Sequence, residues 1–257
     1  MLQRRNVMGV IHLKPLPGTP NGSCSLQEVL DAALSDAMAL REGGVVTTII
    51  ENFGDAPFVR GSVDPHIVAM MTRIAERVKE HTGLELGINV LRNDALAALA
   101  IAATVGAKFV RVNVHTGAAW TDQGLIQGEA YQTLQYRKQL GVDVQIAADV
   151  MVKHATPAGN RTLLDAAKDT VFRGQANALI LTGTATGSTV DFNELKQLRE
   201  DLPQVPLWIG SGIDISNIQQ AIPLADAVIV GTYFHEDGQL TKSLDPKRIK
   251  QLLQMVP

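Results

Sequence analysis

The sequence predicts an α/β fold, a single (β/α)8 barrel spanning residues 1–257, and three observations support it. Eight short β-branched runs alternate with eight stretches of helical periodicity, the pattern of a parallel sheet with helical crossovers. Dividing 257 residues by eight gives about 32 residues per unit, the length that a strand–helix crossover requires. The first strand leads into His12-Leu13-Lys14, so the G-x-G-x-x-G turn of the alternative, an open dinucleotide-binding sheet, is absent.

The expected elements follow one another without an internal linker. The expected strands are 7–12, 46–51, 85–91, 108–114, 143–149, 177–182, 206–210 and 227–231, and the expected helices are 26–41, 65–81, 95–105, 128–140, 162–173, 191–201, 215–221 and 246–255. Ser25 and Glu28 have the spacing of a capping box at the start of the first helix, and Gly43-Gly44 ends it. The longest connections, 14–24, 52–64 and 116–127, each follow a strand, and loops of this length are typically functional.

The composition is that of a globular chain. With 46% hydrophobic and 19% charged residues it can bury a large core, which excludes the disordered and fibrous classes. The net charge of −3 provides no general attraction to nucleic acid or to an anionic membrane surface. The single cysteine, Cys24, cannot form an internal disulfide, and no run reaches the ~20 apolar residues of a membrane helix. We expect a cytoplasmic homo-oligomer with no integral membrane segment and no nucleic-acid partner.

Alternation along the strands predicts which side chains face the barrel interior. In the fourth strand Val110 and Val112 share one face, and Arg111 and Asn113 share the other. The valines must pack under the helices, so the polar pair points inward. A single inward polar residue such as Arg111 is often only a hydrogen-bonded core group.

Five inward polar residues lie at or near the carboxyl ends of their strands, the end where barrel enzymes build active sites. They are His12, Glu51, Asn89, Asn113 and Asp149. Burying carboxylates without a task costs stability, so we interpret Glu51 and Asp149 as catalytic, with His12 as their partner in proton transfer. Asn89 and Asn113 are expected to bind substrate. The same oxygen and imidazole groups could instead hold a divalent ion, although His12 is not part of a His-x-His pair.

Glycine-rich turns follow the last three expected strands. Gly210-Ser211-Gly212 and Gly231-Thr232 occur where barrels commonly bind phosphate, because glycine lets backbone N–H groups approach an anion. Gly183 and Gly187 could extend this cradle or form a lid. Motifs this short also occur as simple tight turns, but their positions favour phosphate binding.

Charged side chains follow two of the strands. Lys153, just past the fifth strand, could clamp an acidic substrate or form a Schiff base, and we favour the clamp because no apolar pocket around it is evident. The neighbouring His154 is expected to contact substrate. Arg92, after the third strand, is a second candidate anion clamp, and Asp94 could cap the third helix.

The remaining aromatic and histidine residues receive simpler interpretations. Trp120 lies in the loop that contains residues 121–124, which could close over a ligand, whereas Trp208 lies within the seventh strand and is expected in the core. His66 and His81 lie on or beside a helix and are expected on the surface.

Several longer motifs resemble the BtpA/SgcQ family almost from end to end. They are GVIHL (9–13) with PLPG (15–18), ENFGDAP (51–57), GINVLRND (87–94), TDQGLIQG (121–128), ADV (148–150) with Lys153-His154, Gly183 and Gly187, and GSG (210–212). The resemblance implies a phosphate-binding (β/α)8 barrel. It also links the chain to photosystem I biogenesis, peripheral to a thylakoid membrane in a phototroph, and, through SgcQ-like members, to sugar metabolism. Many members have a lysine near the position of His235, which could replace it at a phosphate only through an N–H or when protonated.

Two functions from different classes remain open at this point. The first is an enzyme that acts on a small phosphorylated, sugar-like metabolite by isomerase, lyase or aldolase, or hydrolase chemistry. The second, implied by the resemblance alone, is a non-catalytic photosystem I biogenesis or regulatory factor, because fold alone does not fix function.

Overall fold

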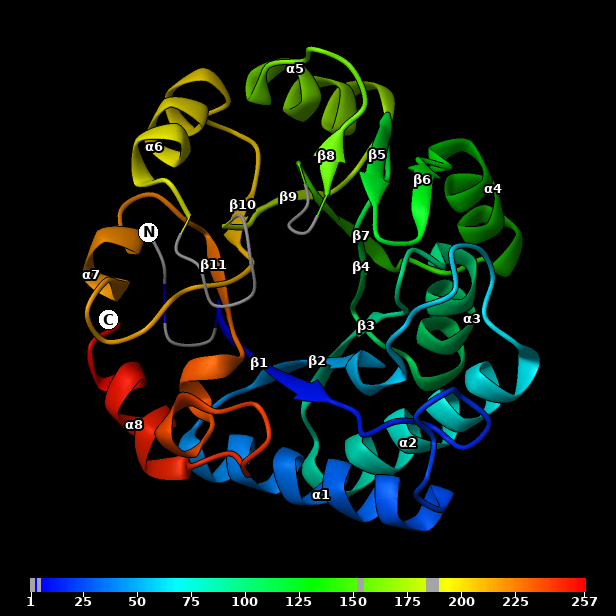
Figure 1. The fold of residues 1–257 in the computed structure, drawn as a ribbon. Coiled ribbons are helices and arrows are strands. Elements are labelled where there is room, and N and C mark those ends of the chain that lie inside the picture. Colours follow the sequence, from blue (N-terminus) through cyan, green and yellow to red (C-terminus); the bar gives the residue numbers. More distant parts are fainter. Residues whose placement is uncertain (1–2, 4–5, 152–154, 184–189) are drawn as a thin grey trace.

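Eight parallel strands close into a barrel, and the helices form a ring around it (Figure 1). The computed structural model describes residues 3, 6–151, 155–183 and 190–257. The barrel strands are β1 (Val7–His12), β2 (Thr47–Glu51), β3 (Glu85–Asn89), β4 (Phe109–Val112), β7 (Gln145–Asp149), β9 (Ala178–Leu181), β10 (Leu207–Ile209) and β11 (Ala227–Val230). Each pairs with the next along the chain, and β11 closes the barrel on β1. The predicted (β/α)8 barrel is therefore confirmed.

The helices begin and end largely where the sequence signals predict. They are α1 (Leu26–Gly43), α2 (Pro65–Thr82), α3 (Ala95–Val105), α4 (Ala130–Leu140), α5 (Leu163–Lys168), α6 (Phe192–Asp201), α7 (Ile218–Ala221) and α8 (Pro246–Gln254). Ser25 and Glu28 form the expected capping box, and Gly44 ends α1 with a positive φ of 98°. None of the helices described is both long enough and apolar enough to cross a membrane.

Two helices are shorter than predicted. α5 gives way after Lys168 to a π-helical turn over Asp169–Arg173. α7 starts only at Ile218, because Asn217 donates to the carbonyl of Gly212 (2.7 Å) and accepts from the N–H of Asp214 (3.0 Å). These two bonds hold the preceding residues as a loop.

Apolar side chains fill two layers, as the alternation predicts. Val110 and Val112 pack in the layer between strands and helices. Phe109 and Trp208 lie in the barrel interior, with their rings edge to face and 5.1 Å between the centroids. The core position expected for Trp208 is confirmed, and the lower barrel is filled by apolar side chains.

A small antiparallel sheet forms where the sequence predicted only loops. β5 (Ala118–Thr121) and β6 (Gly124–Gln127) form a hairpin after β4, and β8 (Thr156–Pro157), in the loop after β7, pairs with β5. Figure 1 shows this sheet between the barrel and helices α4 and α5. Gly124 takes a positive φ of 96° in the tight turn. Trp120 lies on β5 with 57% of its surface exposed.

Asp36 on α1 should make stability depend on pH. Burial raises the pKa of Asp36 to about 6, while a hydrogen bond from the backbone of Leu244 and the charge of Lys14 act in the opposite direction. The folded state therefore binds the proton more tightly than the unfolded chain, and ionisation destabilises the fold as pH rises from about 4 through 6. We expect Asp36→Asn to change little at about pH 4 and to raise the free energy of unfolding by at most about 3 kcal/mol above pH 7.

Urea unfolding at both pH values measures this difference. Asp31→Asn, at an exposed position of the same helix, is the matched control and should show no such pH dependence. An equal effect of Asp36→Asn at both pH values would contradict the prediction.

Candidate functional site

The carboxyl ends of the first three strands bring three of the predicted site residues side by side. His12 is the register partner of Glu51, and Glu51 is the register partner of Asn89. All three side chains face the barrel interior, in the layer directly above the apolar side chains that fill it. Asn113 and Asp149 come from the neighbouring ends of β4 and β7. The five inward polar residues thus lie at one mouth of the barrel.

A buried ion pair organises this mouth. Arg111 donates from Nε and Nη2 to the two carboxylate oxygens of Asp149, at 3.0 and 2.9 Å, and both side chains are almost fully buried. Burial alone lowers the pKa of Arg111, but Asp149 and then Glu51 together outweigh it, so the pKa lies above its ordinary value. Nη1 of Arg111 lies 4.0 Å from the carboxylate of Glu51. The sequence alone left Arg111 open as either a hydrogen-bonded core group or a site residue, and in the structure it lies at the centre of the polar network.

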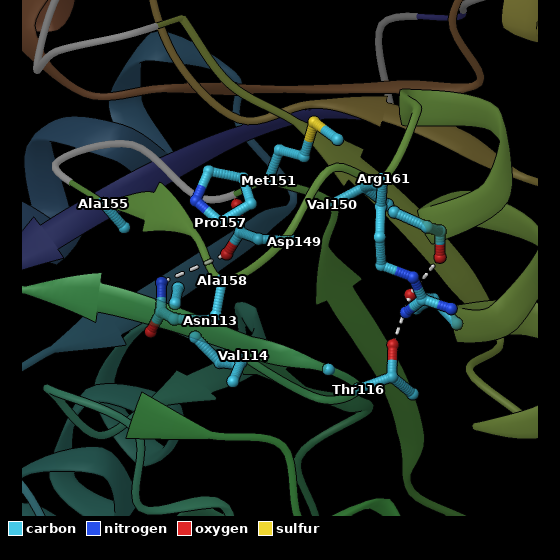
Figure 2. Close-up of a pocket in the computed structure, with 15 residues that line it drawn as sticks. Asn113, Val114, Thr116, Asp149, Val150, Met151, Ala155, Pro157, Ala158 and Arg161 are labelled. Carbon is cyan, nitrogen blue, oxygen red and sulfur yellow. Dashed lines mark hydrogen bonds between the residues drawn. The ribbon is translucent and has the colours of Figure 1, made fainter. Parts of the chain in front are cut away.

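Two asparagines extend the network from Asp149 toward β3. Asn113 donates to Asp149 at 3.1 Å, as Figure 2 shows. Asn89 in turn donates to the side-chain oxygen of Asn113 at 3.0 Å and to the carbonyl of Arg111 at 3.1 Å. Asp149 therefore accepts three hydrogen bonds, and both asparagines are held in fixed orientations.

A second guanidinium reaches the same mouth from the loop after β3. Arg92 is 6% exposed. Burial lowers the pKa of Arg92, while the charges of Asp149, Asp122 and Glu51 act in the opposite direction. Asp122 lies in the turn of the β5–β6 hairpin, so that turn is close enough to Arg92 to influence it electrostatically.

Two imidazole rings lie at the β1 side of the mouth. The ring of His12 packs edge-on against Phe53 at 5.0 Å and lies 5.8 Å from the ring of His235. His235 is 3% exposed, and its Nδ1 contacts the carbonyl of Lys242 at 2.6 Å. Burial lowers the pKa of His235, which favours the neutral ring with its proton on Nδ1. A protonated His235 standing in for a phosphate-binding lysine is therefore disfavoured.

The ENFGDAP motif joins three loops at the rim of the mouth. Asn52 accepts from the N–H of Leu91 at 2.7 Å, and Asp55 accepts from the N–H of Leu16 at 2.8 Å. Asn52 also donates to Asp55 at 3.0 Å. A Cβ at Gly54 would lie 2.4 Å from a backbone nitrogen, so only glycine fits there. These motif residues position the loops after β1, β2 and β3.

The NVLRND motif has a similar role beside Arg92. Asn93 exchanges two hydrogen bonds with the backbone of Val114, at 2.9 and 2.7 Å. Asp94 accepts from the N–H groups of Ala97 and Val63, both at 2.9 Å, so its predicted role as the cap of α3 is confirmed. The loop that carries Arg92 is thereby fixed to its neighbours on both sides.

The glycine turns after β10 and β11 adjoin the polar network. A Cβ at Gly210 would lie 2.6 Å from Ile180 and 3.4 Å from Nη2 of Arg111, and one at Gly231 would lie 2.9 Å from the ring of His12. Close packing thus explains why glycine occupies both positions, and both positions are also suited to binding a ligand. Ser211 is buried, and its hydroxyl has no hydrogen-bond partner among the residues that the structure describes.

Other predicted positions are less informative. Gly212 takes a positive φ of 75°, Gly183 follows β9, and Thr232 opens a 3-10 turn over Thr232–Phe234. Lys153, His154 and Gly187 lie outside the described residues. His81 is exposed as expected. His66 is half-buried rather than fully exposed, because the loop at Gly18 covers its Nε2.

A cavity opens between the polar network and the small sheet. It extends from Asn113 and Asp149 past Pro157 to Arg161, as Figure 2 shows. Ala119 of β5 also lines it. Arg161 pairs with Asp169 at the far end. Part of the predicted mouth is therefore roofed by β5 and β8.

Comparison with known proteins agrees with the resemblance. The model of the BtpA family matches residues 3–257. The chain belongs to the BtpA family. It is 46% identical over 248 residues to the photosystem I biogenesis protein BtpA of Synechocystis sp., which covers 96% of this chain and 86% of the relative. It is 30% identical over 253 residues to the putative sgc region protein SgcQ of Escherichia coli, covering 97% and 93%.

Solved structures share the fold of this BtpA-family chain at low sequence identity. KGPDC from Streptococcus mutans has a TM-score of 0.60 at 9% identity, covering 100% of this chain and 99% of that one. N-(5'-phosphoribosyl)anthranilate isomerase from Pyrococcus furiosus has a TM-score of 0.56 at 12% identity, covering 96% of each chain. At such identities the likeness shows the barrel alone.

Removing only the cation of the buried pair should destabilise the fold more than removing both charges. We expect Arg111→Met to lower the free energy of unfolding by about 3–5 kcal/mol, because Asp149 would remain as a buried charge without its partner. The double variant Arg111→Met with Asp149→Asn should recover part of that loss. Denaturant unfolding measures both, and a double variant no more stable than the single one would contradict the assignment.

Proposed function

We propose that this BtpA-family chain is an enzyme that acts on a small phosphorylated, sugar-like metabolite at the carboxyl-terminal mouth of the barrel. One observation carries the proposal: Glu51, His12 and Arg92 lie at one mouth, next to the glycine turns after β10 and β11. Acids, imidazole and guanidinium groups in this arrangement suit proton transfer on a bound anion. The reaction class is isomerisation, aldol or lyase chemistry, or hydrolysis.

Glu51 is the better candidate for proton transfer of the two carboxylates. Asp149 already accepts three hydrogen bonds from Arg111 and Asn113. The closest cation to Glu51 among the described residues is Arg111, at 4.0 Å, and the Glu51 side chain retains 10% exposure. In this proposal Glu51 moves the proton with His12 as partner, while Asp149 holds Arg111 in place.

The phosphate is assigned to the turns at 210–212 and 231–232, extended by Gly183 and Gly187. Backbone N–H groups of glycine-rich turns can surround an anion, and Arg92 adds a buried positive charge. Lys153 and His154 are proposed to contact the same ligand from the loop after β7. The name of one structural neighbour contains a phosphoribosyl compound, which guides the choice of ligands to test.

The residues that the structure describes include no group of three or more His, Cys, Asp or Glu side chains that could hold a metal ion. The oxygens of Asp149 are already engaged by Arg111 and Asn113. The proposal therefore routes no step through a metal.

Ligand-induced stabilisation tests the phosphate assignment. We expect inorganic phosphate and at least one sugar phosphate to raise the melting temperature, because a ligand at 100 times its Kd stabilises the native state by about 2.7 kcal/mol. Arg92→Met should abolish this shift, whereas Arg77→Met, at an exposed position of α2, should retain it. No shift with any phosphate compound would remove the basis of the proposal. With a substrate identified, Glu51→Gln should abolish turnover while keeping the shift that inorganic phosphate produces.

A role in photosystem I biogenesis is the second candidate function. The 46% identity to the Synechocystis protein named for that process favours it. Expressing this chain in a Synechocystis strain that lacks the relative tests it, with the amount of photosystem I reaction-centre protein as the readout. If this function holds, wild type and Glu51→Gln should restore that amount equally. Failure of the wild-type chain to restore it would count against the role.

A further inference from the structure

The hydrogen bonds around Arg111 can run in only one direction. A guanidinium has donors and no acceptor, so both oxygens of the Asp149 carboxylate must accept from it. Asn113 must then turn its NH2 group toward Asp149, which leaves its oxygen as an acceptor. Asn89 must donate to that oxygen. Arg111 thereby fixes the orientation of the Asn89 amide through Asp149 and Asn113.

The opposite orientation of the Asn89 amide is disfavoured by two contacts. Its NH2 group donates both to Asn113 Oδ1 (3.0 Å) and to the carbonyl of Arg111 (3.1 Å). A flipped amide would place an oxygen against two other oxygens and would lose both hydrogen bonds. The side-chain oxygen of Asn89 is therefore held as an acceptor.

This acceptor has no donor within the part of the chain that the structure describes. Asn89 is 1% exposed, and its Oδ1 has no hydrogen-bond partner among the residues that the structure describes. Its register partner Glu51 also faces the barrel interior and presents carboxylate oxygens, which accept when ionised. Buried polar atoms in native proteins are paired with protein, water or ligand, so this place calls for a donor from outside the network.

From this geometry we infer that Asn89 and Glu51 form an acceptor floor that selects a ligand by its hydroxyl groups. The inference rests on the proposed function and deepens it, because it assigns the part of the ligand that is not phosphate. Two hydroxyl groups of a polyol donate one hydrogen bond to Asn89 Oδ1 and one to Glu51, whereas an alkyl chain at the same place leaves Asn89 Oδ1 buried without a donor and Glu51 without a hydrogen bond from the ligand. The substrate class is then a polyol or sugar phosphate, with Asn89 as a specificity-determining residue.

Chain-matched ligand pairs test the selection by calorimetry. The pairs are glycerol 3-phosphate with n-propyl phosphate, erythritol 4-phosphate with n-butyl phosphate, and ribitol 5-phosphate with n-pentyl phosphate. We expect the polyol phosphate of at least one pair to bind about ten- to a hundred-fold more tightly than its alkyl partner. Equal or tighter binding of the alkyl phosphate in every pair would overturn the inference while leaving phosphate binding intact.

Two variants separate the floor from general damage to the fold. Asn89→Leu should bring the polyol and alkyl affinities to within about threefold of each other, whereas Asn193→Leu, the same change at an exposed position of α6, should keep the preference. Glu51→Gln places a new donor beside Asn89 and should reduce the preference even where Asn89→Leu does not fold. A preference unchanged in both Asn89→Leu and Glu51→Gln would overturn the inference.

The orientation of Asn89 can be measured without any ligand. With both amide hydrogens bonded inside the protein, the Asn89 NH2 resonances should exchange with solvent far more slowly than those of Asn193. Asn89→Leu and Asn193→Leu assign the signals. This measurement decides the case in which no phosphate compound binds. Fast exchange at Asn89 would overturn the inference, and slow exchange would uphold the acceptor floor independently of the phosphate site.

Discussion

A guanidinium enclosed in the barrel sets the arrangement of the polar groups above it. Arg111 lies one step above the apolar filling of Phe109 and Trp208, and its bidentate bond to Asp149 compensates for the loss of water around both charges. Gly210 lacks a side chain where a Cβ would come within 3.4 Å of this guanidinium. The buried pair thus constrains the glycine turn on one side and the asparagines on the other. Replacing such a pair by apolar groups is often harmless to stability, but it would erase the directions that the donor-only arginine imposes.

The frame around the mouth is built from backbone bonds accepted and donated by polar side chains. Asn52 and Asp55 hold the loops after β1 and β3 to the loop after β2, and Asn93 holds the loop after β3 to the end of β4. These residues belong to ENFGDAP (51–57) and GINVLRND (87–94), two of the longest motifs that carry the family resemblance. Their geometry shows that a motif can be long because several loops must be joined at fixed distances. A different set of polar groups faces the mouth itself: His12, Glu51, Asn89, Asn113, Asp149 and the two arginines.

The sequence was sufficient for the barrel and for the inward faces of its strands, because a period of two residues leaves no freedom once the valines are buried. It was insufficient for the β5–β6 hairpin, whose four-residue strands are too short for a clear alternation. It also could not rank Arg111, because its importance depends on a partner 38 residues away on β7. The resemblance links His235 to a phosphate-binding lysine, but burial lowers the pKa of His235 and favours a neutral ring, even though the hydrogen bond to the Lys242 carbonyl acts in the opposite direction. Long-range pairing and burial decide these roles, and neither can be predicted from the neighbouring residues in the sequence.

The strand order suggests how the proposed ligand lies in the mouth. Around the barrel, β11 adjoins β1 on one side with β10 beyond it, and β2 and then β3 follow on the other side. The glycine turns therefore lie on one side of His12, and Glu51 and Asn89 lie on the other. The charge of Arg111 is largely compensated by Asp149, so an anion gains little over that part of the mouth. A phosphate held at the turns would direct the rest of the ligand past His12 toward the acceptors. That orientation brings the reacting part of the molecule between an imidazole and a carboxylate, which is where acid–base chemistry requires it.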